Sequence, residues 1–473
     1  MVFSSLTFLF LFLPLFCLAY LAAPKFLKNA FLFIGGLIFY SWGEPFYVFI
    51  LVISTLIDYS LGVLMHKFDD KPIIRKVALI ASLVMNLSLL GLFKYGGFIA
   101  ENINLLAGRE LFNINLPLPI GISFYTFQTL SYTIDLYRRR IAVQKNPLTF
   151  AAFVTMFPQV VAGPIVRYED VAEELDNRRI TLSMVYEGIC RFVIGLGKKV
   201  LIANNIGVLW ASVKDMAVAG EYSHMSTAVA WLGILAFTFQ IYFDFSGYSD
   251  MAIGLGKIIG FKFPENFNYP YSSLSISEFW RRWHITLGNW FKSYVYFPMG
   301  GSRKGKGRTL INLGVVWLLT GIWHGASWSF IAWGVFMGVM IILEKLFLGK
   351  VLEKLPWFIS NVYVMLFVTL MWVLFDLPNL SGALTYIGVM FGQGGNGLFL
   401  DQKAAYMIIN YGVMFTICII ACSELPKNVI ASLNTRFPAL VAYGTIPVVL
   451  AIFLSCTAYL VNSSYNPFLY FNF

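Results

Sequence analysis

The chain has 473 residues, of which 58% are hydrophobic and only 12% are charged, and its mean hydropathy is +0.72. A soluble domain carries about twice that charged fraction, so this composition excludes a single water-soluble globule and predicts a protein embedded in lipid. The net charge is +10, but the basic residues stand in short clusters between apolar runs, which favours a topology signal over nucleic-acid binding.

The predicted elements are membrane-crossing helices, because apolar runs of roughly 20 residues span the hydrocarbon core. In chain order, such runs lie near 4–23, 27–42, 46–65, 77–93, 117–137, 147–165, 186–210, 226–246, 356–376, 404–423 and 439–461. A further apolar region is too long for one crossing and barely long enough for two: residues 309–344. We predict an all-α polytopic membrane protein with about 10 to 13 crossings plus re-entrant elements, in a single membrane domain over residues 1–473.

The basic clusters predict the orientation of the chain in the membrane. Lys25 and Lys28 follow the first apolar run, whereas no basic residue precedes it, an order typical of a retained first span rather than a cleaved signal peptide. Basic clusters at 67–76 and 138–140 alternate with base-poor stretches. Since basic loops stay in the cytoplasm, we expect the N-terminus outside, and we expect the uncharged residues 462–473 to form an extracytoplasmic C-terminal tail.

The segment FDFSGYSDMAIG, residues 243–254, combines two carboxylates with two hydroxyls at the end of an apolar run. These four side chains either line a polar cavity or bind a cation, or they cap a helix, a position that Ser and Asp favour. The residues are Asp244, Ser246, Ser249 and Asp250. The five cysteines show no metal-ligand spacing, and we predict no metal site.

His284 lies in the aromatic and basic segment SEFWRRWHITLGNWFKSYVYFPMGG, residues 277–301. Arg281 and Arg282 just before it are suited to hold phosphate groups through paired donors. A segment that anchors the protein at the cytoplasmic membrane interface has much the same composition, so both interpretations stay open.

His324 is the histidine placed deepest in apolar sequence, near the middle of residues 309–344. Basic residues stand at both ends of that region, which favours a hairpin or a broken helix with His324 near its deepest point. Gly321 and Gly325 permit such a break and the close approach of another chain or ligand. Histidine titrates near neutral pH and is suited to relay a proton there. The alternative is a histidine that only packs between helices.

Five motifs resemble those of the membrane-bound O-acyltransferase family, and they occur in the order expected of it. They are PIGISFYTFQTLSYTID, PQVVAGPIVR, FDFSGYSDMAIG, SEFWRRWHITLGNWF and GIWHGASWSFIAWG. More narrowly, the chain resembles the bacterial branch that acts in alginate O-acetylation, and the likeness runs over nearly the whole chain. The family's near-invariant histidine falls on His324 and its second motif histidine on His284.

The resemblance implies a ring of membrane helices around a central tunnel in a bacterial inner membrane. It implies transfer of an acetyl or other short acyl group from cytoplasmic acyl-CoA to an extracytoplasmic acceptor, for O-acetylation of alginate or another exopolysaccharide. We expect acetyl-CoA as the donor substrate, no tightly bound cofactor, and an SGNH-type or hydrolase-like partner outside. No GxSxG motif supports a covalent serine mechanism. The alternative function is a secondary transporter or polysaccharide flippase, since these also have broken helices and polar midplane residues.

Tyr470 lies in the aromatic tail NSSYNPFLYFNF, residues 462–473, and is the candidate for a relay that carries the acetyl group outward. An extended tail reaches roughly 30 Å from the last span, enough to fold back into an outer funnel. A phenol with a pKa of about 10 forms an ester that keeps the acetyl group activated. The alternative is an interfacial aromatic anchor. The candidate catalytic residues are therefore His324, His284 and Tyr470, and the candidate donor-binding residues are Arg281 and Arg282.

Overall fold

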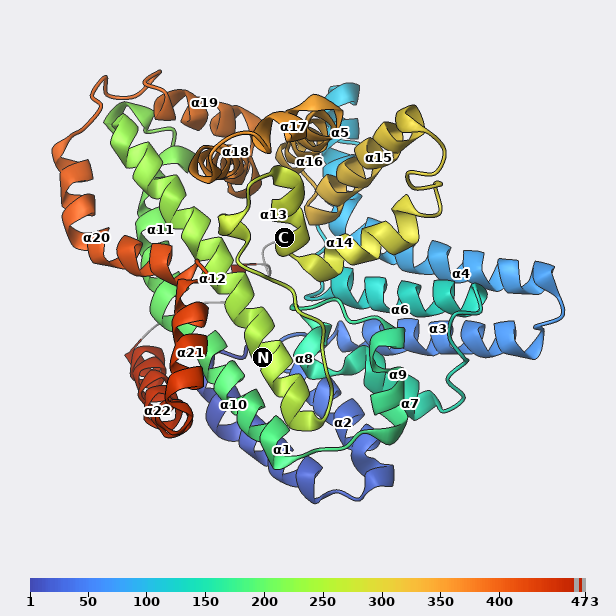
Figure 1. The fold of residues 1–473 in the computed structure, drawn as a ribbon. Coiled ribbons are helices and arrows are strands. Elements are labelled where there is room, and N and C mark those ends of the chain that lie inside the picture. Colours follow the sequence, from blue (N-terminus) through green and yellow to red (C-terminus); the bar gives the residue numbers. More distant parts are fainter. Residues whose placement is uncertain (463–467, 470–473) are drawn as a thin grey trace. The chain divides into compact units, whose positions relative to one another are not determined.

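The structure is a computed structural model that describes residues 1–462 and 468–469. All regular elements among these residues are helices, and the described part of the chain contains no strand. The chain is an all-α polytopic membrane protein (Figure 1), as its sequence predicts.

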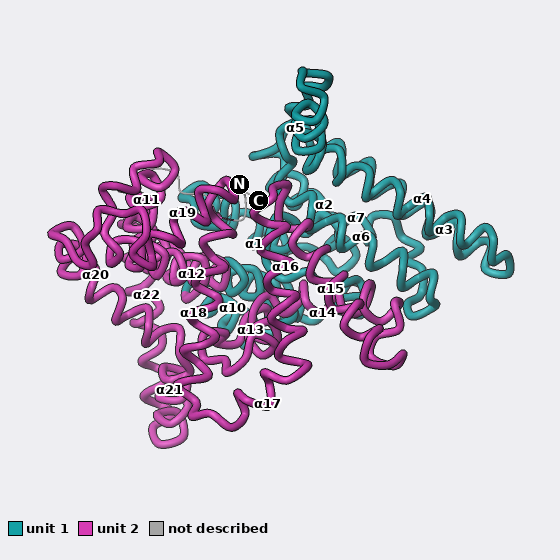
Figure 2. Tube along the Cα trace, turned by 90° about the horizontal axis from the view of Figure 1, so that it is seen from above, with its two compact units in different colours: residues 1–193, 248–265, 470–472 teal, residues 194–247, 266–469, 473 magenta. Residues whose placement is uncertain are grey.

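The described residues form two compact units, which Figure 2 colours separately. Unit 1 comprises residues 1–193 and 248–265, and unit 2 comprises residues 194–247, 266–462 and 468–469. Helices α10 and α12 each supply residues to both units.

The α-helices follow one another along the chain from α1 to α22 (Figure 1). Up to residue 197 they are α1 Leu13–Ala22, α2 Lys28–Ser41, α3 Val48–Lys67, α4 Pro72–Leu90, α5 Gly96–Ala107, α6 Ile122–Tyr137, α7 Pro147–Thr155, α8 Phe157–Val160, α9 Tyr168–Asn177 and α10 Leu182–Gly197. The later ones are α11 Asn204–Val218, α12 Thr227–Ile259, α13 Ile276–Arg282, α14 Ile285–Phe291, α15 Lys306–His324, α16 Trp328–Leu343, α17 Gly349–Leu352, α18 Trp357–Asp376, α19 Leu380–Met390, α20 Gln402–Ala421, α21 Leu425–Arg436 and α22 Pro438–Asn462.

Eight helical segments of the described residues are long and apolar enough to cross a membrane. They are Val48–Lys67, Pro72–Ala107, Leu182–Val218, Thr227–Ile259, Trp328–Leu352, Trp357–Asp376, Gln402–Ala421 and Pro438–Asn462. The sequence-based number of about 10 to 13 also counted the runs 117–137 and 147–165. There the structure has 16-residue α6 and nine-residue α7, because Gly121 with φ 79° directly precedes α6 and α7 ends at Thr155, shortly before Pro158.

A buried carboxylate ties helices together inside unit 1. Asp58 on α3 is fully buried and accepts a hydrogen bond of 2.6 Å from the Ser82 hydroxyl on α4. The Asn86 amide, one turn further along α4, donates to both Asp58 oxygens at 3.1 and 2.9 Å. A carboxylate inside a membrane domain is costly unless its oxygens are satisfied, and these contacts satisfy both.

Helices α15 and α16 of unit 2 pack tightly against each other. A Cβ atom on Gly321 of α15 would lie 2.6 Å from the Phe330 carbonyl, and one on Gly334 of α16 would lie 2.6 Å from the Trp317 carbonyl. Only glycine permits this approach. Helix α15 ends at His324, Gly325 is extended, and α16 begins at Trp328. The predicted break of the apolar region at His324 is confirmed.

Candidate active site

His324 lies at the last position of α15 and is almost completely buried, with 2% of its surface exposed. Aromatic rings surround its imidazole. The ring centroids of Trp323, Trp333 and Phe375 lie 4.9, 5.1 and 5.1 Å from that of His324, each at a steep angle. Such an enclosure keeps bulk water from the imidazole, and electrostatic and proton-transfer interactions are stronger in a dry site.

His284 is the second buried histidine of unit 2 and connects two short helices, α13 and α14. Its backbone has φ 43° and ψ 52°, a left-handed conformation that a residue with a Cβ adopts only when its surroundings enforce it. Its ring centroid lies 4.8 Å from that of Phe245 and 6.2 Å from that of Trp323. Because Trp323 also contacts His324, the structure brings both histidines to one aromatic cluster.

Asn266 fixes the protonation form of His284. The Asn266 side-chain oxygen accepts hydrogen bonds from the Thr286 backbone N–H at 3.3 Å and from its hydroxyl at 2.9 Å, which identifies that atom as the amide oxygen. His284 Nδ1 lies 3.1 Å from the same oxygen and therefore carries a proton. Burial lowers the pKa of His284 to about 3. At neutral pH the ring is thus uncharged, with its lone pair on Nε2.

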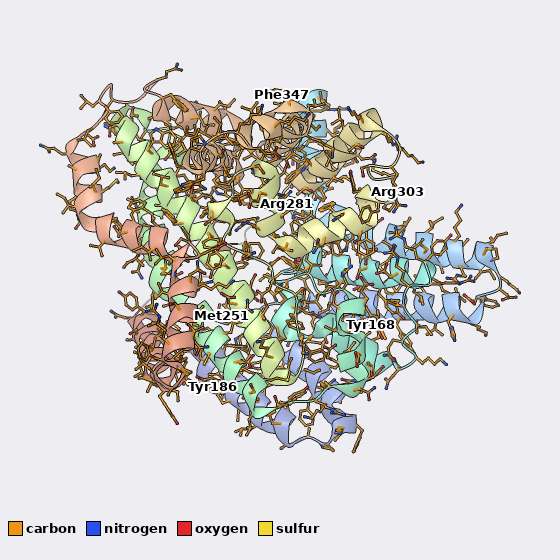
Figure 3. All side chains as sticks on the ribbon, in the orientation of Figure 1. Tyr168, Tyr186, Met251, Arg281, Arg303 and Phe347 are labelled. Carbon is orange, nitrogen blue, oxygen red and sulfur yellow. The ribbon has the colours of Figure 1, made fainter. Side chains whose placement is uncertain are left out.

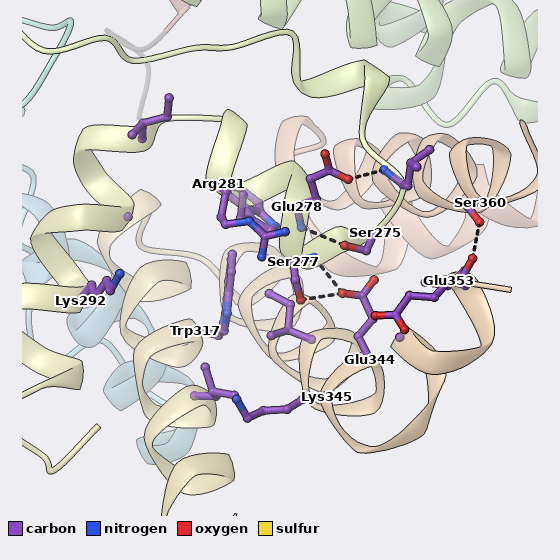
Figure 4. A pocket seen from close by; sticks show the side chains of 18 of the residues that line it. Ser275, Ser277, Glu278, Arg281, Lys292, Trp317, Glu344, Lys345, Glu353 and Ser360 are labelled. Carbon is purple, nitrogen blue, oxygen red and sulfur yellow. Dashed lines mark hydrogen bonds between the residues drawn. The ribbon is translucent and has the colours of Figure 1, made fainter. Parts of the chain in front are cut away.

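A cavity of about 960 Å³ is lined by residues of α13 and α14, among others (Figure 4). Three cationic side chains line it, together with three acidic ones: Arg281, Lys292 and Lys345, and Glu278, Glu344 and Glu353. Aromatic walls are supplied by Trp280 and Trp317. Cations beside a partly apolar cavity suit a ligand that carries phosphate groups on a less polar body.

Glu344, which lines the cavity, holds the start of α13 in place beside it. Its buried carboxylate accepts hydrogen bonds from the Ile276 and Ser277 backbone N–H groups at 2.5 and 2.8 Å and from the Ser277 hydroxyl at 2.6 Å (Figure 4). The Tyr363 hydroxyl lies 3.1 Å from the same carboxylate. Since Arg281 stands one helical turn after Ser277, these bonds fix where its guanidinium enters the cavity.

Tryptophan side chains connect the cavity with His324. Trp280 lies 4.8 Å from Trp317 and 5.5 Å from Trp333, measured between ring centroids. Trp333 is fully buried and is the same residue whose ring contacts His324. One layer of aromatic side chains therefore lies between the cavity that Arg281 lines and the buried imidazole.

The two candidate donor-binding arginines are placed differently. Arg281 lines the cavity and is exposed (Figures 3 and 4). Arg282 is not among the lining residues. Its guanidinium pairs with Glu278 at 2.8 Å and Glu424 at 3.2 Å. His284 does not line the cavity either and lies with Phe245 and Trp323.

The segment 243–254 lies inside α12, so the helix-capping alternative for its carboxylates and hydroxyls is wrong. Asp244 instead forms an ion pair of 2.5 Å with Lys199, and both side chains are buried. Asp250, which belongs to unit 1, pairs with Arg191 at 2.8 Å. Within the described residues no group of three or more metal-ligating side chains occurs.

The described part of the C-terminal tail contacts the same region of α12. The Leu469 backbone N–H donates a hydrogen bond of 2.9 Å to Asp244. Phe468 is buried and its ring lies 5.5 Å from that of Phe245, which in turn contacts His284. Tyr470, the candidate relay, lies outside the described residues.

Three residues of this site were not predicted from the sequence: Asn266, Glu344 and Lys199. Asn266 contacts His284, which lies 18 residues further along the chain. Glu344 accepts hydrogen bonds from Ile276 and Ser277, which lie 68 and 67 residues before it. No local sequence pattern signals a contact at such separations. Lys199 had a signal, because a lysine within an apolar run calls for a partner charge, and Asp244 is that partner.

Comparison with known proteins gives consistent similarities. The sequence model of the membrane-bound O-acyltransferase family matches residues 137–382, which include His284 and His324. The chain is 37% identical to the probable alginate O-acetylase AlgI of Pseudomonas putida over the full length of both. It is 34% identical to the peptidoglycan O-acetyltransferase of Helicobacter pylori, over 87% of this chain and 83% of the relative. Identity to the teichoic acid D-alanyltransferase of Bacillus subtilis is 29%, over 51% and 62% respectively.

Proposed function

The chain belongs to the membrane-bound O-acyltransferase family, and from this membership we propose that it moves an acetyl group from cytoplasmic acetyl-CoA to an extracytoplasmic acceptor. The protein is an O-acyltransferase that passes the membrane several times. The acceptor class is a polysaccharide, with alginate or another exopolysaccharide favoured by the relatives named alginate O-acetylase.

The observation that carries the proposal is the position of His324. A helix ends at this residue inside the apolar interior, and aromatic side chains separate its imidazole from a cavity lined by cations. The phosphates of the donor bind at Arg281, Lys292 and Lys345 through charge-assisted hydrogen bonds. The thioester end of the donor then points along Trp280 towards His324.

The transfer step uses the imidazole of His324 as the base. His324 removes the proton of the accepting hydroxyl, whose oxygen attacks the thioester carbonyl. The carbon–sulfur bond breaks, an oxygen–acyl bond forms, and the leaving sulfur takes the proton back from His324 to give the free thiol of CoA. His284, neutral and held in its Nδ1–H form by Asn266, accepts a hydrogen bond at Nε2 from the reacting groups.

The first acceptor is the phenol of Tyr470. Anchoring of Phe468 and Leu469 on α12, beside Phe245 and His284, supports a tail that reaches the reacting centre. The aryl ester passes its acetyl group to an SGNH-type or hydrolase-like protein outside the inner membrane, where both termini lie. Tyr470→Phe separates this relay from an aromatic anchor, since it keeps the ring and removes only the nucleophile. Undiminished transfer to the external partner would leave the tail as an anchor.

The test is release of CoA thiol from acetyl-CoA by the purified full-length protein in detergent. His324→Ala is expected to lower the rate by about 10²–10⁴-fold, the usual contribution of a positioned base. His66→Ala is the matched control, because His66 is an exposed histidine of α3. A rate in His324→Ala above about a tenth of wild type, from a protein that inserts and purifies normally, contradicts the assignment.

A further inference from the structure

A second cavity, of about 800 Å³, is lined by residues of unit 1. Five parts of the chain line it: the turn before α2 with the first residues of that helix, the start of α7, the end of α9 with the residues after it, the start of α10, and the turn after α12. Five of its lining residues are cationic, namely Lys25, Lys28, Arg178, Arg179 and Lys262. Three are acidic, namely Glu173, Glu174 and Asp176, so the lining has a net positive charge.

Arg178 lines this cavity, and several contacts hold its guanidinium in place. Its Nε donates to the Tyr20 hydroxyl at 2.6 Å and its Nη1 to the Asn29 side-chain oxygen at 2.8 Å. The guanidinium also lies over the rings of Tyr20 and Phe261, with its Cζ 5.7 and 5.2 Å from their centroids. These contacts hold the positive charge in place but supply no negative charge to balance it.

Three carboxylates line the cavity with the five cations, so the positive charge is in excess by two. Within the described residues none of them forms an ion pair, although carboxylates line the same cavity. Lys28 and Arg178 both lie over the ring of Tyr20, and the Lys28 Nζ is 4.9 Å from its centroid. Burial and the neighbouring charges of Arg178 and Lys25 lower the pKa of Lys28. Like charges held together in this way attract an anion from outside the protein.

Gly260 allows the turn that carries Lys262 to lie close to the arginines of the cavity. This residue has φ 92° and follows α12, and a Cβ atom on it would lie 2.9 Å from Ile180 and 3.4 Å from the Arg179 carbonyl. The turn that carries Lys262 therefore lies directly against the arginines. The convergence of separate chain segments distinguishes this cluster from a basic loop that only sets topology.

The cavity is bordered by apolar side chains that face outward. Phe26, which lines it, is 79% exposed, and Leu21, the residue before the last of α1, is 44% exposed. Basic residues beside an exposed apolar surface are the arrangement that recognises an anionic headgroup while the acyl chains lie along the helices. We propose that this cavity binds a phosphate-bearing anion, namely the headgroup of an anionic membrane phospholipid.

The experiment uses the full-length protein in detergent with added phosphatidylglycerol or phosphatidylcholine, and native mass spectrometry to count bound lipid. The wild type is expected to retain phosphatidylglycerol preferentially. Lys28→Gln combined with Arg179→Gln is expected to lower that preference by about 30-fold, which corresponds to about 1 kcal/mol for each basic residue. The matched control removes the same charge elsewhere in unit 1: Lys67→Gln combined with Lys71→Gln, both exposed near Phe68.

Lys262→Gln, in the turn after α12, is the second variant and keeps the test decisive if the double variant does not fold. A preference unchanged in the cavity variants, or lost equally in the control, overturns the proposal. Inorganic phosphate separates the two possible sources of the anion. Protection of the wild type against thermal unfolding by phosphatidylglycerol alone supports a lipid headgroup, and equal protection by inorganic phosphate supports a soluble phosphate. Protection by neither overturns the site.

Discussion

At the scale of single residues, the active site depends on how each histidine is held. His324 is held by packing, between Trp323, Trp333 and Phe375. His284 is held by a hydrogen bond and by a left-handed backbone conformation of the kind that concentrates at functional sites. Both rings contact Trp323, but of the two histidines Asn266 contacts only His284, and Trp333 and Phe375 contact only His324, so substitutions at these residues can perturb the two histidines separately.

Asn266→Ala is expected to lower the rate of transfer by about tenfold or more, because it leaves the buried Nδ1–H of His284 without its acceptor, a loss of about 1–3 kcal/mol. Asn266→Asp retains an acceptor and should recover part of the rate. Asn268→Ala is the control, since that side chain is exposed and two residues away. The measurement is the steady-state rate of thiol release. Equal rates for Asn266→Ala and Asn268→Ala would show that His284 needs no such partner.

Arg281→Ala is expected to raise the KM for acetyl-CoA by about tenfold or more while changing kcat less, because a hydrogen bond to a charged group contributes about 1.5–3 kcal/mol. Arg282→Ala gives the comparison, since its guanidinium pairs with Glu278 and Glu424 and does not line the cavity. The check is a titration of donor concentration for both variants. A KM that rises only in Arg282→Ala would place the donor elsewhere.

At the scale of elements, the packing of α15 against α16 fixes the position and orientation of His324. Gly321 and Gly334 face each other across this pair, and each glycine lies against a carbonyl of the other helix. Gly321 is one turn before His324, so a shift of the helices at this point reaches the imidazole directly.

Gly321→Ala is expected to destabilise the protein by about 1–3 kcal/mol, because the new methyl group overpacks the contact with Phe330, and to reduce the transfer rate. Gly314→Ala on the same helix has nothing within 4 Å of its new Cβ and should be neutral or slightly stabilising. Thermal unfolding in detergent and the transfer rate of both variants provide the measurement. A Gly321→Ala protein as stable and as active as Gly314→Ala would refute the tight contact.

The sequence predicted those parts of this element that depend on local chemistry. The length of 309–344 and the glycines around His324 were enough to predict the break, and the basic clusters at both ends predicted a hairpin. Contacts between distant segments were not predictable, because Glu344 caps α13 and Asn266 holds His284 only after the chain has folded. The position of 243–254 within α12 was missed since Ser and Asp, which favour helix starts, here face buried partners.

At the scale of the whole molecule, the protein combines two buried candidate catalytic histidines with a polytopic membrane architecture. The cavity lined by Arg281 and the described tail residues Phe468 and Leu469 belong to the same unit as both His284 and His324. A donor that binds at the cavity and an acceptor carried on the tail would meet at His324. This arrangement predicts that the acyl group is transferred from one side of the membrane to the other.

The direct test uses sealed vesicles that contain the purified protein, with the external partner protein enclosed and acetyl-CoA labelled in its acetyl group added outside. Vesicles are selected in which the cytoplasmic face of the protein points outward. Transfer predicts label on the enclosed partner, reduced by about 10²–10⁴-fold in His324→Ala, while CoA stays outside. Label that reaches the partner only after the vesicles are opened, or that reaches it equally in His324→Ala, would contradict the account.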